Sequence, residues 1–297
     1  MKLRLLDLGR LEYDEGFPIA GGGGVSTASQ PSPPVTRRTV ALIASLIEHP
    51  KVGPVLFDTG APPGYLELWP PIVQELFAIT RYEPQQHLDA ALEAAGYGLD
   101  DIRAIVLSHL HLDHAGGLEF FRGRDIPIYV QGDELRNAFY NVATGEDLGA
   151  YLPHYLDFSF NWQPLDGDQI ELFDGFHLYR LPGHTPALQG LRLDLANAGT
   201  FFLTSDQFHL RDNYEGPAPL GWLLRGVETE SCGAALDHRH RPRGVGVGPV
   251  GVLDEPRVQR LDPGETGRPE ISRVLGRRHV RLTRLGCART RAPRRER

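Results

Sequence analysis

Short apolar runs separated by polar turns dominate the first 231 residues and predict a protein rich in β-strands. Residues 40–47 form an apolar run, and the turn at 49–54 leads back to the apolar residues 55–57, which predicts a β-hairpin. Residues 102–107 form a short run that is apolar except for Arg103, which is typical of a buried strand. The first residues of the chain, 1–13, also fit a strand. This part of the chain therefore begins as a β-sheet.

Helical spacing of apolar residues appears between these strands. Residues 72–79 show a helical pattern, and a second pattern over 85–95 ends at Gly96. Further strands are expected near 128–130, 170–173, 177–181, 191–195 and 200–204, with a region of mixed pattern between 131 and 160. Strands with helices between them indicate an α/β sandwich in which polar residues gather at the strand ends.

The composition changes sharply near residue 230. Residues 232–297 contain nine glycines, six prolines and no aromatic residue, whereas all the Phe, Tyr and Trp residues lie before them. The first 231 residues have a net charge of -16, and the remainder has a net charge of +9. We therefore expect one folded domain over 1–230 and an Arg/Gly/Pro-rich tail over 231–297, disordered or aberrant. A nucleic-acid-binding arm would be supported by charge alone, because no aromatic is present for base stacking.

The overall composition bears on where the protein is located in the cell and on which residues can bind a metal. No run approaches the roughly 18 apolar residues of a membrane-spanning helix, and the N-terminus lacks the pattern of a secretory signal. We therefore expect a cytoplasmic protein. Its two cysteines, Cys232 and Cys287, lie too far apart in sequence to suggest a disulfide framework or a cysteine-built zinc site. Any metal would be held by histidine and carboxylate.

The strongest chemical signal is the motif His109-x-His111-x-Asp113-His114, which directly follows the buried strand at 102–107. Zinc takes imidazole and carboxylate ligands, and a catalytic zinc site keeps one position open. Two histidines at i and i+2 leaving a strand point the same way, because side chains alternate along a strand. The Asp-His pair further round the turn can face a second metal. Two glycines after the motif permit a tight turn. The motif predicts a metal site.

The motif SHLHLDHAGG does not stand alone. Together with Asp58-Thr59-Gly60 upstream, the loop PGHTP at 182–186 and Ser205-Asp206 downstream, it resembles the metallo-β-lactamase superfamily. The resemblance covers about residues 1–228 in the order and spacing of the family. It implies a four-layer αβ/βα sandwich with the metals at one edge, so residues 1–230 would be a hydrolase domain.

The resemblance also implies a set of ligands for two Zn²⁺ ions. The first zinc would be held by His109, His111 and His184. The second would be held by Asp113 and His114, and Asp206 would bridge both. Taken by themselves, His184 also fits an ordinary polar loop residue and Asp206 a turn cap. Asp58 would orient a ligating histidine through a hydrogen bond, or simply form a turn.

Within the superfamily the chain is most similar to N-acyl homoserine lactone lactonases. The form HLHLDHAGG, the long segment between Asp58 and the motif, and the stretch from Asp206 to Glu215 carry this resemblance. Those enzymes usually place a tyrosine three residues after the bridging aspartate, where this chain has His209. A histidine can also donate a hydrogen bond to a substrate carbonyl or oxyanion. Tyr214 is a second candidate for that role, or a packing residue.

One expected ligand is absent from the sequence. In the family the second zinc also takes a histidine from a Gly-His-Asp turn beyond the bridging aspartate, and this chain contains no Gly-His-Asp. The remaining candidates are His238, His240 and His279, none of which follows a recognisable strand. We expect the second site to bind zinc more weakly, and we hypothesise that the tail derives from an altered reading frame or mis-splicing.

The resemblance implies a reaction as well as a fold. A metal-bound hydroxide would attack the carbonyl of a lactone, with Asp113, Asp206 and His209 as the catalytic side chains and Asp206 carrying a proton to the leaving alkoxide. Alternatives on the same scaffold are a thioesterase, a glyoxalase II-like enzyme or an inactive protein that keeps the fold. The expected partner is a small-molecule substrate, with no membrane or nucleic acid involved. Leu68, Trp69 and Phe77 would line an acyl-chain pocket or belong to the core.

Overall fold

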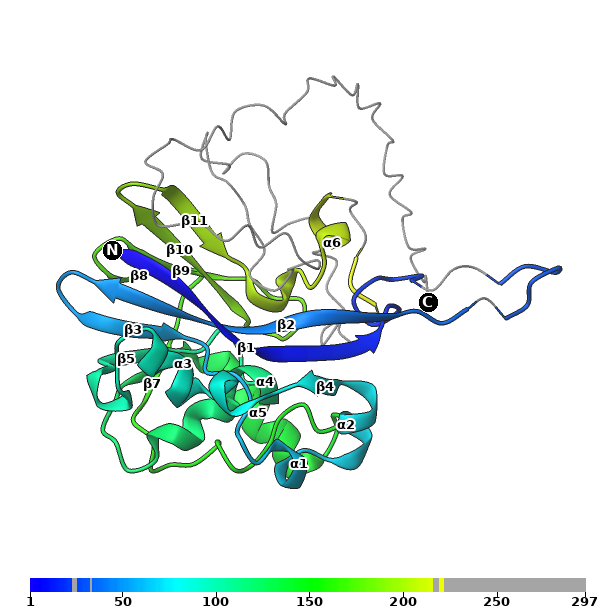
Figure 1. Ribbon diagram of the computed structural model, residues 1–297, viewed down its shortest axis with the longest axis horizontal. Coiled ribbons are helices and arrows are strands. Elements are labelled where there is room, and N and C mark those ends of the chain that lie inside the picture. The colour runs from blue at the N-terminus through cyan, green and yellow to red at the C-terminus, as the bar shows by residue number, and fades with distance from the viewer. Residues whose placement is uncertain (23–25, 33, 216–218, 222–297) are drawn as a thin grey trace, which may run out of the picture. The chain divides into compact units, whose positions relative to one another are not determined.

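Two β-sheets lie face to face in this protein, and helices cover the outer face of the larger sheet (Figure 1). The computed structural model describes residues 1–22, 26–32, 34–215 and 219–221. In the described residues, seven strands form the larger sheet in the order β4-β1-β2-β3-β5-β6-β7, and four form the smaller sheet in the order β11-β10-β9-β8. The expected α/β sandwich is confirmed.

The larger sheet is built from strands that lie between residues 2 and 165. Its strands are β1 (Lys2–Asp14), β2 (Arg37–His49), β3 (Gly53–Phe57), β4 (Ala78–Arg81), β5 (Ala104–Val106), β6 (Ile128–Gln131) and β7 (Trp162–Leu165). The strands of the smaller sheet follow without interruption. They are β8 (Gln169–Phe173), β9 (Phe176–Arg180), β10 (Gln189–Leu195) and β11 (Gly199–Leu203).

In the described residues, all the α-helices but one are short. The α-helices are α1 (Tyr65–Leu68), α2 (Pro71–Leu76), α3 (Leu88–Ala94), α4 (Leu112–Ala115), α5 (Gly132–Thr144) and α6 (Arg211–Glu215). The 3₁₀ helices are η1 (Pro84–Gln86), η2 (Leu99–Asp101), η3 (Gly116–Phe121) and η4 (Ser205–Gln207). Two of them, η3 and η4, flank the clustered histidines described below.

The hydrophobic pattern predicted most of the strands, but it missed β7 and differed from the structure in two further places. The helix expected over residues 72–79 ends at Leu76, and Ile79 instead belongs to β4, where it pairs with Leu11 of β1. Residues 78–81 form the edge strand β4 because they find backbone hydrogen-bond partners on β1. The spacing of apolar residues in the sequence does not show such a distant partner. The mixed region at 131–160 contains the longest helix, α5, which was not predicted.

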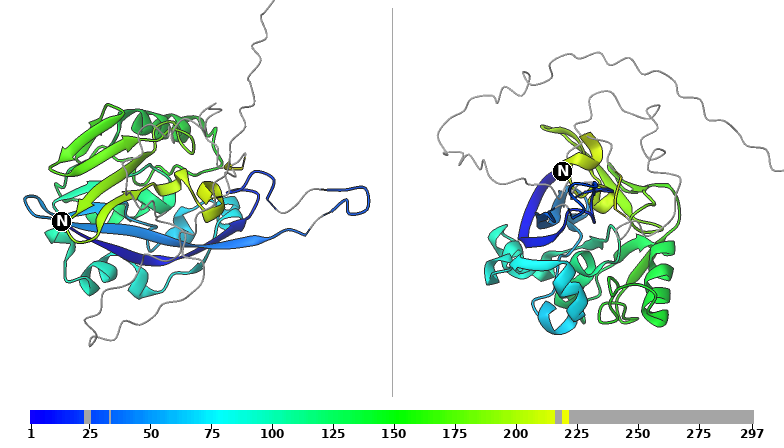
Figure 2. Two further views of the ribbon diagram at one scale, coloured as in Figure 1. Left: turned by 90° about the horizontal axis from the view of Figure 1, so that it is seen from above. Right: turned by 90° about the vertical axis from the view of Figure 1, so that its right-hand side faces the viewer.

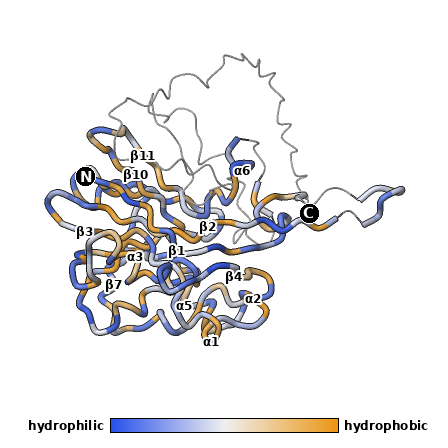
Figure 3. Tube along the Cα trace, in the orientation of Figure 1, coloured by the Kyte–Doolittle hydropathy of each residue, from blue (hydrophilic) through white to orange (hydrophobic). Residues whose placement is uncertain are grey.

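Two separate cores explain why the central strands are apolar. Side chains such as Val55 and Val106 from the larger sheet pack against Leu178 and Leu191 from the smaller one. On the opposite face, the helices cover a second cluster that includes Trp69. Strand β5 is buried on both faces because it lies in the parallel part of the sheet, and this accounts for its unbroken apolar sequence. Hydrophobic residues recur along the strands where the sheets meet (Figure 3).

The register of the strands brings several chain segments to one edge. Strand β3 pairs in parallel with β5, and β5 pairs in parallel with β6, so their carboxyl ends point the same way. In the smaller sheet, β9 and β11 both run antiparallel to β10 and therefore also end together. The views in Figure 2 show the two sheets from above and from the side. The polar residues that follow these strands meet at that edge.

Several expectations lie outside the described residues. These are the domain boundary near residue 230, the tail at 231–297, and the alternative ligands His238, His240 and His279. Among the described residues, no helix combines the length and the apolar character needed to cross a membrane.

Candidate metal centre

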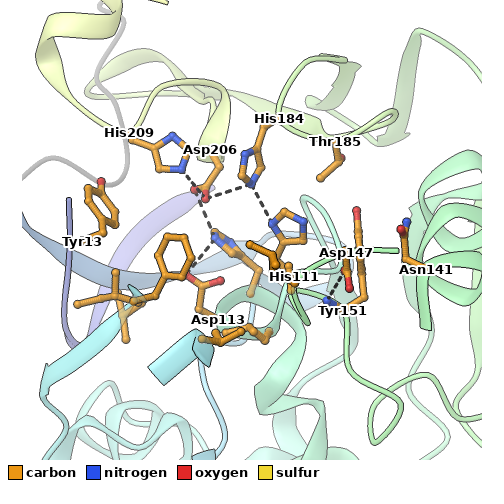
Figure 4. A pocket seen from close by; sticks show the side chains of 18 of the residues that line it. Tyr13, His111, Asp113, Asn141, Asp147, Tyr151, His184, Thr185, Asp206 and His209 are labelled. Carbon is orange, nitrogen blue, oxygen red and sulfur yellow. Dashed lines mark hydrogen bonds and ion pairs between the residues drawn. The ribbon is translucent and has the colours of Figure 1, made fainter. Parts of the chain in front are cut away.

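The structure brings together the histidines and aspartates that the sequence singled out as ligands (Figure 4). Two histidines follow β5, Asp113 and His114 lie on α4, His184 lies in the loop between β9 and β10, and Asp206 lies in η4 after β11. In three overlapping groups, the donor atoms all lie within 4.8 Å of one another. These groups are His109, His111 and His184; His109, His114 and Asp206; and His184, Asp206 and His209.

The first group has the geometry of an imidazole site. The Nδ1 atom of His111 lies 2.9 Å from Nε2 of His184. Nε2 of His109 is buried and has no hydrogen-bond partner among the described residues. A buried polar nitrogen without a partner is costly, and a zinc ion bound at about 2.0–2.1 Å would satisfy several such nitrogens at once. The donor set fits a metal ion.

The carboxylate of Asp206 faces this group and a second one. Its Oδ1 atom lies 3.3 Å from Nε2 of His114, and its Oδ2 atom lies 3.6 Å from Nε2 of His184. Asp113 Oδ2 lies 3.8 Å from Nε2 of His114. Asp206 therefore stands between the three-histidine group and the Asp113–His114 pair, at the place where the sequence resemblance positioned a bridging carboxylate.

Buried hydrogen bonds behind the centre fix which ring nitrogens face it. Asp58 Oδ2 lies 2.9 Å from Nδ1 of His114, which leaves Nε2 of that ring facing Asp206. Asp58 Oδ1 accepts the backbone N–H of Ser108 at 2.7 Å, and Oδ2 accepts the Ser108 hydroxyl at 2.8 Å. Asp58 thus orients His114 by a hydrogen bond, one of the two roles considered from sequence.

Two serines in this network were not found from sequence. Ser108 Oγ lies 3.0 Å from Nδ1 of His109, and Ser205 Oγ donates to Ser108 Oγ at 2.8 Å. Ser205 and Asp58 both have left-handed backbone angles, with φ of 49° and 63°. Such strain in non-glycine residues concentrates at functional sites. The sequence analysis used the pair Ser205-Asp206 as part of the family resemblance, but it did not predict the contact of Ser205 with Ser108.

Comparison with known proteins adds independent evidence. The pattern of the Metallo-beta-lactamase superfamily matches residues 44–243 of this chain. The chain belongs to the metallo-β-lactamase superfamily. The cluster of histidines and aspartates is its candidate metal centre.

Its relatives in the superfamily are similar over most of the described chain. The N-acyl homoserine lactonase AiiB of Agrobacterium fabrum is 33% identical over 234 residues, which cover 75% of this chain and 83% of AiiB. The N-acyl homoserine lactonase AiiA of Bacillus thuringiensis subsp. kurstaki is 31% identical over 170 residues, covering 56% of this chain and 64% of AiiA.

A solved structure shows the same fold. It is an N-acyl homoserine lactone hydrolase with the product N-hexanoyl-L-homoserine bound at the catalytic metal centre. This structure aligns with a TM-score of 0.61 at 26% identity and covers 75% of this chain and 82% of that chain.

The electrostatics of this metallo-β-lactamase centre favour a cation. Burial lowers the pKa of His109 and of His111 well below the usual value, and neighbouring histidines add to that effect. A lowered pKa favours the neutral imidazole, which is the form that donates a lone pair to a metal. Burial alone would lower the pKa of His114, but Asp206, Asp113 and Asp58 raise it well above its usual value. The carboxylates around His114 thus stabilise a positive charge at this part of the centre.

His209 contacts Asp206 directly. Its Nε2 atom lies 3.0 Å from Asp206 Oδ2, and its ring is largely buried. Burial would raise the pKa of Asp206, but His209 and His114 together hold it well below its usual value. Tyr214, the other candidate from sequence, has its ring 6.1 Å from that of Phe208.

A cavity of about 710 Å³ opens over the centre. His111, His184 and Asp206 are among the residues that line it. One wall is apolar and comes from β1, β2, α2 and the residue after α2; it includes Leu11, Val40, Val73 and Phe77. Another wall is polar and comes from α5 and the loop after it; it includes Asn137, Tyr140, Asn141 and Tyr151. Of the three pocket residues considered from sequence, Phe77 lines the cavity, Trp69 belongs to the core, and Leu68 is not a lining residue.

We expect the variant Asp58→Asn to bind metal about 10- to 100-fold more weakly, because an amide replaces the carboxylate that orients His114 and takes part in the Ser108 network. Competition with a chromogenic chelator measures this affinity. Asp100→Asn is the matched control, since its side chain is 88% exposed and pairs with Arg124 away from the centre. Equal affinities for the two variants would show that Asp58 has no orienting role.

Proposed function

We propose that this protein is a zinc-dependent lactonase that hydrolyses the ester bond of an N-acyl homoserine lactone-like substrate. The observation that carries the proposal is the convergence of three histidines, an Asp-His pair and Asp206 beneath one cavity with an apolar wall. Relatives named as N-acyl homoserine lactonases, at 31–33% identity, support the substrate class.

In this proposal the centre takes two zinc ions, the second of them more weakly because the sequence lacks the Gly-His-Asp ligand. His109, His111 and His184 would hold the first ion, Asp113 and His114 the second, and Asp206 would contact both. Bound zinc would lower the pKa of a water molecule towards 7 and polarise the lactone carbonyl. The remaining steps belong to side chains of this chain.

Two side chains are proposed to act on the substrate directly. Asp206 would take up the proton that the attacking water loses as its oxygen bonds to the carbonyl carbon. It would pass this proton through a carboxylate oxygen to the ring oxygen of the lactone as the ester bond breaks, so that the leaving group departs as an alcohol. His209 lies beside Asp206 and also lines the cavity. It would donate a hydrogen bond to the carbonyl oxygen as negative charge develops there. Asp113 would hold its ion within reach of that oxygen.

The apolar wall of the cavity is proposed to bind the acyl chain. Phe77 lines it and contacts Phe17 and Tyr13 through its ring, with centroids 5.3 and 6.2 Å apart. We expect Phe77→Ala to raise KM about tenfold for a decanoyl substrate and much less for a butanoyl substrate, because about 1–2 kcal/mol of apolar contact is lost. The value of kcat should change little.

Steady-state kinetics with both substrates test this expectation. Leu68→Ala is the control, because Leu68 is 37% exposed and does not line the cavity. An equal rise in KM for short and long acyl chains would place the acyl chain elsewhere.

A substrate panel with metal analysis tests the function itself. The full chain, loaded with zinc and dialysed, is assayed against homoserine lactones and thioesters, and its metal content is measured. We expect lactone hydrolysis that stops after chelation and returns with zinc, together with loss of both metal and activity in His109→Ala. Faster cleavage of thioesters would identify a different hydrolase on this fold. A chain that takes up no zinc and cleaves neither substrate would be an inactive member of the superfamily.

A further inference from the structure

A buried acid lies directly behind the metal centre and is used by none of the steps above. Glu134 is in the first turn of α5, and its side chain is 0% exposed. Burial raises its pKa, and no lysine or arginine is among the described groups that stabilise its carboxylate. Burying a carboxylate without a positive partner is costly. The buried carboxylate of Glu134 is therefore expected to have a specific role.

The hydrogen bonds of Glu134 lead to the first metal-binding loop. Its Oε1 atom accepts the backbone N–H of Leu110 at 3.1 Å. Leu110 stands between His109 and His111, so this bond holds the peptide that joins His109 to Leu110, in the segment that carries both imidazoles. Side chains that alternate along an extended segment keep a common direction only while that backbone is held.

The same oxygen reaches a second side chain of the site. Glu134 Oε1 accepts the Tyr151 hydroxyl at 3.1 Å. The ring of Tyr151 packs edge-on against His111, with centroids 4.7 Å apart, and Tyr151 also lines the cavity. Glu134 therefore acts on both histidines, through the His109–Leu110 peptide and through the ring that packs on His111.

A third segment near Glu134 is the loop that carries His184. The Thr185 hydroxyl and the Ala187 backbone oppose the effect of burial on the Glu134 carboxylate and lower its pKa. Glu134 Oε2 and Thr185 Oγ1 nevertheless form no well-aligned hydrogen bond with any described residue. The carboxylate thus touches the loop of His109 and His111, contacts Tyr151, and faces the loop that follows His184.

We propose that Glu134 is a positioning residue of the metal centre, which holds the peptide of Leu110 and the ring of Tyr151 so that His109 and His111 present their nitrogens to one ion. Its negative charge also balances the positive charge of that ion. The inference rests on the proposed function only in requiring that the centre binds a divalent metal; it does not depend on the substrate.

Glu134→Gln tests this proposal, because it keeps the size of the side chain and removes its charge. We expect the full-length variant to bind zinc about 10- to 100-fold more weakly in chelator competition. The d–d absorption of the Co²⁺-loaded protein should also change. The metal-free variant should be at least as resistant to thermal unfolding as the metal-free wild type, since a buried uncompensated charge has been removed. A residue that only supports the fold would give the opposite pattern.

Two further variants complete the experiment. Asp133→Asn, in the same helical turn, removes a surface carboxylate that pairs with Arg180 and should leave zinc affinity unchanged. Tyr151→Phe removes one hydrogen bond to Glu134 but keeps the charge, and should weaken zinc binding less than tenfold; it is informative even if Glu134→Gln does not fold.

The possible results separate this proposal from the proposed function. Wild-type zinc affinity and an unchanged Co²⁺ spectrum in Glu134→Gln would overturn the positioning role. A loss of metal-free stability that parallels the loss of zinc would overturn it as well. A wild-type protein that binds zinc but cleaves no lactone would refute the lactonase while leaving the Glu134 result intact.

Discussion

Replacing Asp206 with asparagine is expected to lower the kcat for lactone hydrolysis by about a hundredfold or more. The carboxylate faces both groups of the centre, through Oδ1 to His114 at 3.3 Å and through Oδ2 to His184 at 3.6 Å. An amide presents only one oxygen, cannot carry a proton and brings no negative charge. The variant should therefore lose metal affinity and the proton transfer to the leaving group together.

Measurement of both quantities distinguishes these causes. Zinc content and kcat are determined for Asp206→Asn with and without a saturating excess of zinc, and the rate should stay low even when the metal is restored. Asp212→Asn is the matched control, since Asp212 is an exposed carboxylate that pairs with Arg38. Full recovery of the rate at high zinc would limit Asp206 to metal binding.

The largest expected effect on stability comes from Gly117→Ala. The N–H of Gly117 donates to the carbonyl of Gly60 at 2.8 Å, which holds the motif turn against the segment after β3. A Cβ atom on residue 117 would clash with the carbonyl oxygen of Thr59 and lie 2.9 Å from its carbonyl carbon. Neither backbone can move without breaking this contact. We expect a loss of about 3 kcal/mol in the free energy of unfolding, or about 10 °C in Tm.

Thermal unfolding of the metal-free protein checks this value without interference from the metal. Gly98→Ala serves as the control, because an added Cβ there meets only Asp101 Oδ2, at 3.7 Å, an ordinary contact. A Tm for Gly117→Ala equal to that of the control would mean that the turn adjusts freely, and that the second glycine after His114 is not required for close packing.

The sequence by itself determined the local features of the site. The apolar run at 102–107 fixed a buried strand, and His109 and His111 leave it two residues apart, so a common direction for the two rings followed from the period of an extended chain. Most of the other strands were also predicted from their apolar residues. A strand buried on one face alternates apolar and polar residues, and a strand buried on both faces is continuously apolar. The family resemblance then supplied His184 and Asp206 as partners, which no local pattern could do.

Only the tertiary structure decided how these pieces meet. The parallel register of β3 with β5 places Asp58 beside Ser108 and His114, and the end of β11 brings Ser205 to the same hydrogen-bonded network. The strand β4 and the role of Glu134 were likewise invisible in sequence. The physical reason is the same in each case: a hydrogen bond or a buried charge is defined by its partner, and here every partner comes from a distant segment that folding alone brings near.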